Sequence, residues 1–245
     1  MKPVSIDLYQ DGADLDDMRR AYASGLVQGF TTNPTLMRKA GITDYEGFAR
    51  AAITAIPDLP ISFEVFSDDF AEMEREVRII AGWGGNTYVK IPITNTRGES
   101  SLPLVQRLSA ENFALNITAV TTLAQVEGVL NAVNPRARTI VSVFAGRIAD
   151  TGRDPVPVMR EAADMMADME NARLLWASPR EVLNIRQAEE CGCHIITATP
   201  DILNKLPLFG KNLDEFSLET VQMFHRDACA AGYRLLDRAF ETESV

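Results

Sequence analysis

Residues 87–94 read TYVKIPIT, a run of β-branched and apolar side chains interrupted by one lysine. Because successive side chains of a strand point to opposite faces, Val89, Ile91 and Ile93 share one face and Lys90 points to the other. A lysine is rarely buried unless it is paired. The pattern therefore indicates a strand with one apolar face and one polar face.

Two neighbouring runs show the same alternation. In ISFEVF the polar side chains are Ser62 and Glu64, and in FALNIT they are Asn116 and Thr118. The apolar faces suit packing against helices. The polar faces are therefore expected to point into one shared interior.

Segments with strand character recur eight times along the chain, at 4–10, 27–31, 61–66, 87–93, 113–119, 139–144, 173–177 and 194–198. Segments with helical periodicity lie between most of them. This alternation predicts a parallel sheet, and eight repeats favour a closed (β/α)₈ (TIM) barrel, of class α/β. An open doubly wound sheet is the alternative, but no G-x-G-x-x-G motif follows the first strand.

Several helices carry local start and stop signals. Asp14, Ser67 and Thr122 precede helical segments and are expected to cap their N-termini. Gly25 and Gly192 stand where helices are expected to end.

Residues 1–245 are expected to form one domain, because barrels of about 250 residues are common. From 206 to 245 the repeat gives way to an appendage, predicted as a loop over 206–216 and a final helix over 217–240. Its expected role is packing or contact within a homo-oligomer.

Composition excludes several classes of protein. The net charge of −10 argues against a nucleic-acid surface, because phosphate backbones are bound by clustered Lys and Arg. No apolar run reaches the roughly 20 residues of a membrane-spanning helix, and the start MKPVSIDLY lacks the apolar core of a signal peptide. A cytoplasmic protein without a membrane partner is expected.

Three cysteines, Cys191, Cys193 and Cys229, are too few for a disulfide scaffold. Cys191, Cys193 and His194 together resemble metal ligands, but C-x-C-H lacks the usual spacing and no second ligand cluster follows. Free, mostly buried thiols and no metal are expected.

Lys90 is the most informative single residue. An amine attacks a carbonyl only when it is unprotonated, and apolar neighbours such as Val89, Ile91 and Pro92 would lower its pKa. A lysine that protects an exposed sheet edge is the alternative, although a closed barrel has no edges.

Five stretches resemble, in chain order, signature blocks of the transaldolase family: GFTTNPTL (29–36), YVKIPIT (88–94), LNIT (115–118), SVFAGRI (142–148) and WASPRE (176–181). The resemblance spans nearly the whole chain. The short length is similar to the compact branch that holds the smaller transaldolases and the fructose-6-phosphate aldolases.

The resemblance implies a role for each matching residue. Lys90 would form the Schiff base, Asp11 would act as acid and base at the substrate hydroxyl, and Glu64 with Thr118 would hold the catalytic water. Asn33, Asn116 and Ser142 would hydrogen-bond the hydroxyls of the dihydroxyacetone unit, and Phe144 would line the pocket. Purely structural roles stay open as alternatives. Asp11 could cap the first βα turn, Asn33 could form a turn, and Asn116 with Thr118 could form an internal hydrogen-bonded pair.

Arg147, Ser178 and Arg180 are expected to bind an anionic group of the substrate. They follow the sixth and seventh strands, and a helix is predicted to begin at about Arg180, where backbone N–H groups and a guanidinium suit a phosphate. Surface arginines in loops are the alternative.

The family resemblance implies a transferase that moves a dihydroxyacetone unit from a ketose phosphate to an aldose, without a cofactor. The nearest rival is an aldolase that releases dihydroxyacetone, but such enzymes carry glutamine and tyrosine where Glu64 and Phe144 stand. A barrel that only binds an anion, or an isomerase with Glu64 as its base, is a rival of another class. Gly12, Val143 and Pro179 depart from the family pattern near the expected pocket, so the natural substrate can differ.

Overall fold

The computed structural model describes residues 4–235. Eight strands alternate with helices along the chain, and the strands are β1 (Asp7–Asp11), β2 (Gly29–Thr31), β3 (Ile61–Glu64), β4 (Thr87–Pro92), β5 (Leu115–Val120), β6 (Thr139–Val143), β7 (Ala172–Trp176) and β8 (Ile195–Ala198). The helices that follow them are α1 (Leu15–Ser24), α2 (Pro34–Lys39), α3 (Tyr45–Ala55), α4 (Phe70–Ala81), α5 (Leu102–Ala110), α6 (Leu123–Ala132), α7 (Ala145–Asp150), α8 (Val156–Met165), α9 (Leu183–Glu190) and α10 (Pro200–Leu203).

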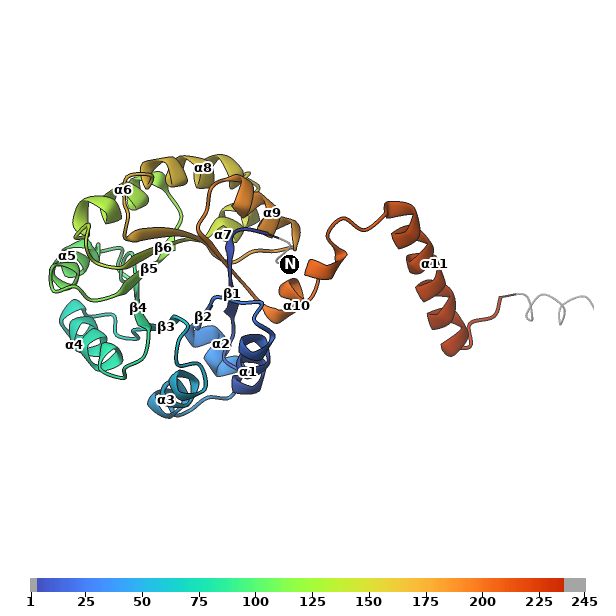
Figure 1. Ribbon diagram of the computed structural model, residues 1–245, viewed down its shortest axis with the longest axis horizontal. Helices are drawn as coiled ribbons and strands as arrows, with labels where there is room; N and C mark the ends of the chain where they lie inside the picture. The colour runs from blue at the N-terminus through green and yellow to red at the C-terminus, as the bar shows by residue number, and fades with distance from the viewer. Residues whose placement is uncertain (1–3, 236–245) are drawn as a thin grey trace, which may run out of the picture. The chain divides into compact units, whose positions relative to one another are not determined.

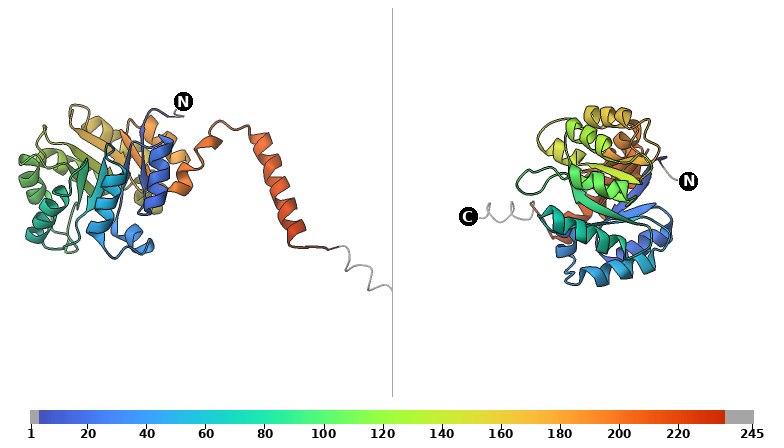
Figure 2. Two further views of the ribbon diagram at one scale, coloured as in Figure 1. Left: turned by 60° about the horizontal axis from the view of Figure 1, so that its bottom comes forward. Right: turned by 90° about the vertical axis from the view of Figure 1, so that its left-hand side faces the viewer.

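The eight strands form a closed parallel barrel in sequence order, with β8 pairing back to β1. Figure 1 shows the strands at the centre with the longer helices around them, and Figure 2 shows the same arrangement from two further sides. The predicted TIM barrel is therefore confirmed. Each predicted strand overlaps an observed one.

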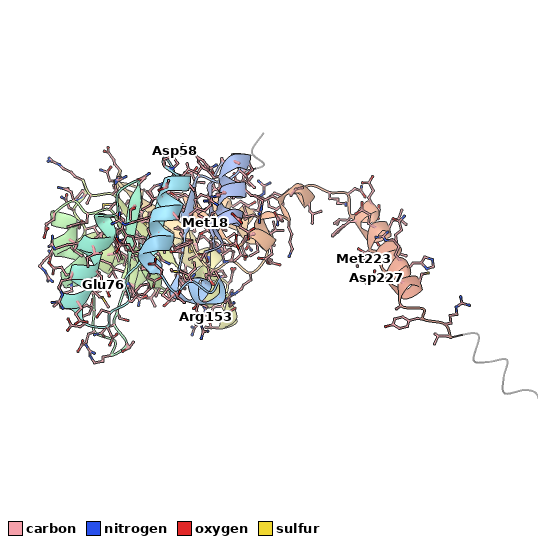
Figure 3. The ribbon with its side chains drawn as sticks, turned by 90° about the horizontal axis from the view of Figure 1, so that it is seen from below. Met18, Asp58, Glu76, Arg153, Met223 and Asp227 are labelled. Atoms are coloured by element: carbon pink, nitrogen blue, oxygen red, sulfur yellow. The ribbon has the colours of Figure 1, made fainter. Side chains whose placement is uncertain are left out.

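Local capping explains where the helices start. The side chains of Asp14 and Thr122 accept the expected backbone hydrogen bonds, and Gly25 ends α1 with a left-handed φ of 66°. The prediction of Ser67 as a cap was wrong, because Asp69 accepts the N–H groups of Ala71 and Glu72. The inward face of α1 buries Met18 completely (Figure 3).

A layer of large side chains fills the barrel interior. It contains Tyr9, Tyr88, Ile140, Leu175 and Ile195. Room for the Tyr9 ring comes from Gly29 on the paired strand, since a Cβ at Gly29 would lie 2.5 Å from Tyr9 Cζ. The interior is thus closed by packing, and polar side chains collect beyond this layer at the carboxyl ends of the strands.

Among the described residues, 4–206 form one compact unit and 207–235 form another. A 3₁₀ turn (Leu206–Leu208) precedes α11 (Leu213–Ala230). The predicted start at 217 was wrong, because Asn212 caps the helix by accepting the N–H groups of Asp214 and Glu215. The helix also ends at Ala230, before the predicted end, and residues 236–240 of the prediction lie outside the described residues.

No residue of α11 is buried, and its exposed apolar side chains are Leu213, Phe216, Leu218, Val221, Met223 and Phe224. Figure 3 labels Met223 and Asp227, one helical turn apart.

Cys191 and Cys193 are buried free thiols, as predicted, and Cys229 is an exposed one. The Nδ1 of His194 accepts a hydrogen bond from the Leu174 N–H at 3.0 Å, which gives this ring a structural role. Within residues 4–235, no helix has the length and apolar character needed to cross a bilayer.

Candidate active site

A cavity of about 450 Å³ opens at the carboxyl ends of the strands. In a (β/α)₈ barrel this is the end that carries the active site. Its walls include these candidates from the sequence: Asp11, Asn33, Glu64, Lys90, Thr118, Ser142, Phe144, Arg147, Ser178 and Arg180. Strands β1, β3, β4, β5 and β6, the segments after β2, β6 and β7, and helix α7 therefore bring together residues that are far apart in the chain.

Lys90 lines this cavity and is itself buried. It pairs in register with Glu64 on β3 and with Asn116 on β5. Its Nζ lies 3.0 Å from Glu64 Oε2 and donates a hydrogen bond of 2.8 Å to the Thr32 carbonyl. The buried cation is thus paired, as a charge of low exposure requires.

The expected apolar surroundings of the amine were wrong. Val89 and Ile91 are buried on the opposite face of β4, as the strand alternation requires, and the partners of Nζ are a carboxylate and a carbonyl. The strand sequence defined the face of Lys90, but the neighbours of Nζ come from β3 and from the turn after β2.

Asp11 ends β1 and does not cap α1, which Asp14 does. Its Oδ1 accepts a hydrogen bond of 2.8 Å from Thr31 Oγ1, which also lies 2.6 Å from Thr197 Oγ1. Burial raises the pKa of Asp11 above its ordinary value, while the Lys90 charge and the Thr31 hydrogen bond oppose that rise. A carboxyl group with a raised pKa in a cleft suits proton transfer.

Asn116 is fully buried beneath the cavity. Its Nδ2 donates to Ser62 Oγ at 3.0 Å, and its Oδ1 accepts from Ser142 Oγ at 2.6 Å. Ser142 lines the cavity, so its oxygen remains able to accept from a ligand hydroxyl. The alternative of an internal Asn116–Thr118 pair is not observed, and Asn116 belongs to this Ser62–Asn116–Ser142 chain.

Thr118 Oγ1 is buried and has no hydrogen-bond partner within the described part of the chain. The next residue, Ala119, has a φ of 60°, at an irregularity in the pairing of β5 with β6. A left-handed alanine is strained, and such strain collects at functional sites. The irregularity lies beside the cavity wall formed by Thr118 and Phe144.

Asn33 acts as the N-cap of α2, because its Oδ1 accepts the Leu36 N–H at 3.0 Å. Asn33 therefore has a local structural role, as a helix cap instead of the turn former given as its alternative. Asn33 also lines the cavity, so the capping hydrogen bond fixes the position of its side-chain amide in the cavity wall.

The predicted helix start at Arg180 was wrong, because α9 begins at Leu183. The N–H groups of Arg180 and Glu181 donate to Asn184 Oδ1 instead of pointing freely at a ligand. The Arg180 guanidinium also forms an ion pair with Asp150. Any anion site here therefore depends on side chains more than on a helix N-terminus.

Ser178 stands in a left-handed conformation with a φ of 59°. Helix α7 approaches it closely, since a Cβ at Gly146 would lie 1.5 Å from the Ser178 carbonyl oxygen. This close approach holds α7, which carries Arg147, beside the loop that carries Arg180 at the cavity.

Sequence reasoning missed Thr31, Thr197 and Lys39, all of which line the cavity. Thr31 shares a strand face with Gly29, and Thr197 shares one with Ile195, so strand parity could have placed both in the interior. No comparable signal was available for Lys39, which ends the short helix α2.

A closed parallel barrel with a buried lysine–carboxylate pair in its carboxyl-end cavity defines a (β/α)₈-barrel enzyme. A model of the family described as "Transaldolase/Fructose-6-phosphate aldolase" matches residues 8–235. The chain belongs to this family.

Named relatives agree with the family match. The chain is 30% identical over 200 residues to a "Probable transaldolase" of Dehalococcoides mccartyi, covering 81% of this chain and 89% of that protein. It is 33% identical over 212 residues to "Probable transaldolase 2" of Listeria monocytogenes, covering 85% and 93% of the two chains. The predicted transaldolase-type enzyme is therefore confirmed at the level of the family.

Among solved structures, the fold is similar to dihydrodipicolinate synthase from Rhodopseudomonas palustris, with a TM-score of 0.56 and 12% identity. That match covers 85% of this chain and 76% of the other. At this identity the likeness concerns the barrel fold alone.

Proposed function

We propose that this enzyme transfers a dihydroxyacetone unit from a ketose phosphate to an aldose acceptor through a Schiff base on Lys90. The observation that carries the proposal is the Lys90 amine in a carboxyl-end cavity, 3.0 Å from Glu64 and close to the Asp11 carboxyl group. A lysine nucleophile needs an adjacent group that can take and return its proton. Glu64 is positioned for that task.

In the first half of the reaction, the neutral Lys90 amine attacks the ketose carbonyl and forms a carbinolamine. Loss of water, with a proton supplied through Glu64 and a water held by Thr118, gives the protonated imine. Asp11 then takes the proton of the C4 hydroxyl as the C3–C4 bond breaks, and the electron pair of that bond moves to the imine to form an enamine. The aldose phosphate leaves.

In the second half, the enamine carbon attacks the carbonyl of the acceptor aldose, and Asp11 returns its proton to the new hydroxyl. Water then hydrolyses the imine and regenerates Lys90. The protonated imine supplies the electron withdrawal that the bond cleavage requires, so the proposed chemistry uses no metal or organic cofactor.

Hydrogen bonds to the dihydroxyacetone unit are assigned to Asn33 and Ser142. Asn116 lies behind Ser142 and orients its hydroxyl, which is supported by the hydrogen bond of 2.6 Å between them. Phe144 supplies an apolar wall.

The terminal phosphate is assigned to Arg147, Ser178 and Arg180. Arg147 is exposed in the cavity wall, and a guanidinium binds phosphate through charge-assisted hydrogen bonds. Because Arg180 pairs with Asp150, it is expected to contribute less than Arg147.

The proposal extends to the setting of the enzyme: a cytoplasmic homo-oligomer that exchanges sugar phosphates, as the pentose phosphate pathway requires. The exposed apolar side chains of α11 support self-association, because such side chains commonly mark contact surfaces. Light scattering of the purified protein measures the number of subunits.

The function is tested by measuring turnover of fructose 6-phosphate with and without erythrose 4-phosphate. A transferase requires the acceptor, so turnover is expected to rise strongly when it is added. Equal release of dihydroxyacetone without acceptor would instead identify an aldolase. No conversion of any ketose phosphate would point to the non-covalent binding barrel.

A further inference from the structure

The pairing of β2 with β3 stops just before Glu64. Phe30 N–H donates to the Pro60 carbonyl and Thr32 N–H to the Ser62 carbonyl, in the two-residue steps of a parallel ladder. The next step would join Glu64 N–H to the Thr32 carbonyl, and the N–H of residue 34 to the Glu64 carbonyl. Neither bond forms.

One of these bonds is impossible, and the acceptor of the other is bound by another group. Residue 34 is a proline and has no N–H to donate. The Thr32 carbonyl accepts a hydrogen bond of 2.8 Å from Lys90 Nζ. The end of β2 therefore binds the ammonium group and leaves the Glu64 backbone without a strand partner on this side.

Tyr45, the first residue of α3, takes the place of that partner. Its hydroxyl donates to the Glu64 carbonyl at 2.9 Å and accepts from the Glu64 N–H at 2.8 Å. A phenol can do both at once, because it carries one donor and acceptor lone pairs. Burial raises the pKa of the Tyr45 phenol well above its ordinary value, so the donor persists throughout the neutral range.

Three aromatic side chains hold the Tyr45 ring. Its centroid lies 4.5 Å from that of Phe66, 5.2 Å from that of Trp83 and 6.2 Å from that of Phe63, and the last two contacts are edge-to-face. Such packing restricts the ring and so fixes the position of its hydroxyl.

We infer that Tyr45 is a positioning residue for the reaction: it holds the Glu64 backbone so that the carboxylate meets Lys90, while the Thr32 carbonyl remains available to the ammonium group. The inference rests on the proposed Schiff-base function. Tyr45 acts through Glu64, and removal of its hydroxyl should therefore affect the step in which Glu64 moves protons more than the binding of the donor sugar.

The test uses Tyr45→Phe in the full chain. We expect kcat to fall by about 10- to 100-fold, as small misplacements of catalytic groups do, with KM for fructose 6-phosphate changed less than about threefold. The matched control is Tyr22→Phe, which also removes a hydroxyl bonded to protein, here to Asp58 at 2.6 Å on the surface (Figure 3 labels Asp58). The control should keep kcat within about twofold.

A double-mutant cycle separates positioning from simple loss of structure. In a Glu64→Gln background, Tyr45→Phe should lower kcat by less than about threefold, because the group that it positions is already gone. Equal losses in both backgrounds would overturn the inference, as would an unchanged kcat in Tyr45→Phe alone.

A second variant tests the same inference if Tyr45→Phe does not fold. Phe66 is 52% exposed and forms one wall of the Tyr45 site, so Phe66→Ala should loosen the ring while keeping its hydroxyl. It should lower kcat several-fold, and this loss should also disappear with Glu64→Gln. A loss that persists there would contradict the inference.

Borohydride trapping of the wild type in the same preparation separates this inference from the proposed function. Absence of a trapped imine in the wild type would refute the Schiff base. Trapping in the wild type with an unchanged Tyr45→Phe would refute the Tyr45 role alone.

Discussion

Lys90 Nζ and Glu64 Oε2 lie 3.0 Å apart on paired positions of β4 and β3, with side-chain exposures of 7% and 18%. Removing two charged groups from water costs free energy unless the two charges are paired. The pair is therefore more than a surface ion pair: it places an amine beside a carboxylate in the cavity.

The identity of residue 64 is expected to control the fate of the covalent intermediate. Glu64→Gln combined with Phe144→Tyr should lower acceptor-dependent transfer and raise the share of dihydroxyacetone released without acceptor. The reason is that a carboxamide cannot exchange protons at the imine, and a phenol adds a new donor in the cavity. The measurement is product analysis with and without erythrose 4-phosphate. An unchanged ratio of transfer to release would contradict it.

The raised pKa of Asp11 predicts a specific dependence of stability on pH. Because burial raises its pKa in the folded state, the unfolded chain loses this proton first as pH rises above the ordinary value of 3.8. The free energy of unfolding therefore falls as the pH rises from 3.8 to the raised pKa. Above that range the loss of stability is complete.

Asp11→Asn should thus be more stable than the wild type near neutral pH, with the difference shrinking below the ordinary carboxyl pKa. The same variant should lose at least about 100-fold in kcat, because the proton acceptor is gone. Urea unfolding at several pH values measures the first effect. Asp16→Asn, on the exposed face of α1, is the control and should change stability by less than about 0.5 kcal/mol.

Arg147 is expected to recognise the terminal phosphate. Arg147→Ala removes a charge-assisted contact of about 1.5–3 kcal/mol, which corresponds to a loss of about 10- to 100-fold in kcat/KM on a phosphorylated ketose. A non-phosphorylated ketose should be little affected. Arg153→Ala, a surface arginine outside the cavity walls (Figure 3), is the matched control. Equal losses on both ketoses would assign Arg147 to the fold.

Gly29 is expected to be essential for packing inside the barrel. Gly29→Ala places a Cβ 2.5 Å from the fully packed Tyr9 ring and should lower the free energy of unfolding by about 1–3 kcal/mol. In Gly12→Ala, the nearest atom to the new Cβ is 3.8 Å away, so that control should stay within about 0.5 kcal/mol. Similar denaturation midpoints for the two variants would contradict the packing argument.

The sequence predicted the barrel and half of the residues that line the cavity, because strand alternation is local. The period-two pattern around Lys90, Glu64 and Thr118 defines their face directly, and closure of the sheet then brings these faces together. The polar contacts between them depend on register and on neighbouring loops, which alternation does not specify.

Errors arose where side chains from elsewhere satisfy the backbone. Asn184 accepts the N–H groups of Arg180 and Glu181, so a segment that resembles a helix start is a turn instead. Ser67 was predicted to cap α4, but its hydroxyl accepts the Asp69 N–H, and Asp69 is the residue that caps the helix. No sequence pattern indicated the contact of Tyr45, because its hydroxyl bonds the backbone of Glu64 on β3, 19 residues along the chain.

The Schiff base on Lys90 is tested most directly by intact-mass and peptide analysis after borohydride reduction with fructose 6-phosphate. Reduction fixes the imine, so we expect a stable three-carbon adduct on the peptide that contains Lys90, and none in Lys90→Ala. Full activity of Lys90→Ala, or an adduct on another lysine such as Lys39 in the wild type, would contradict the account.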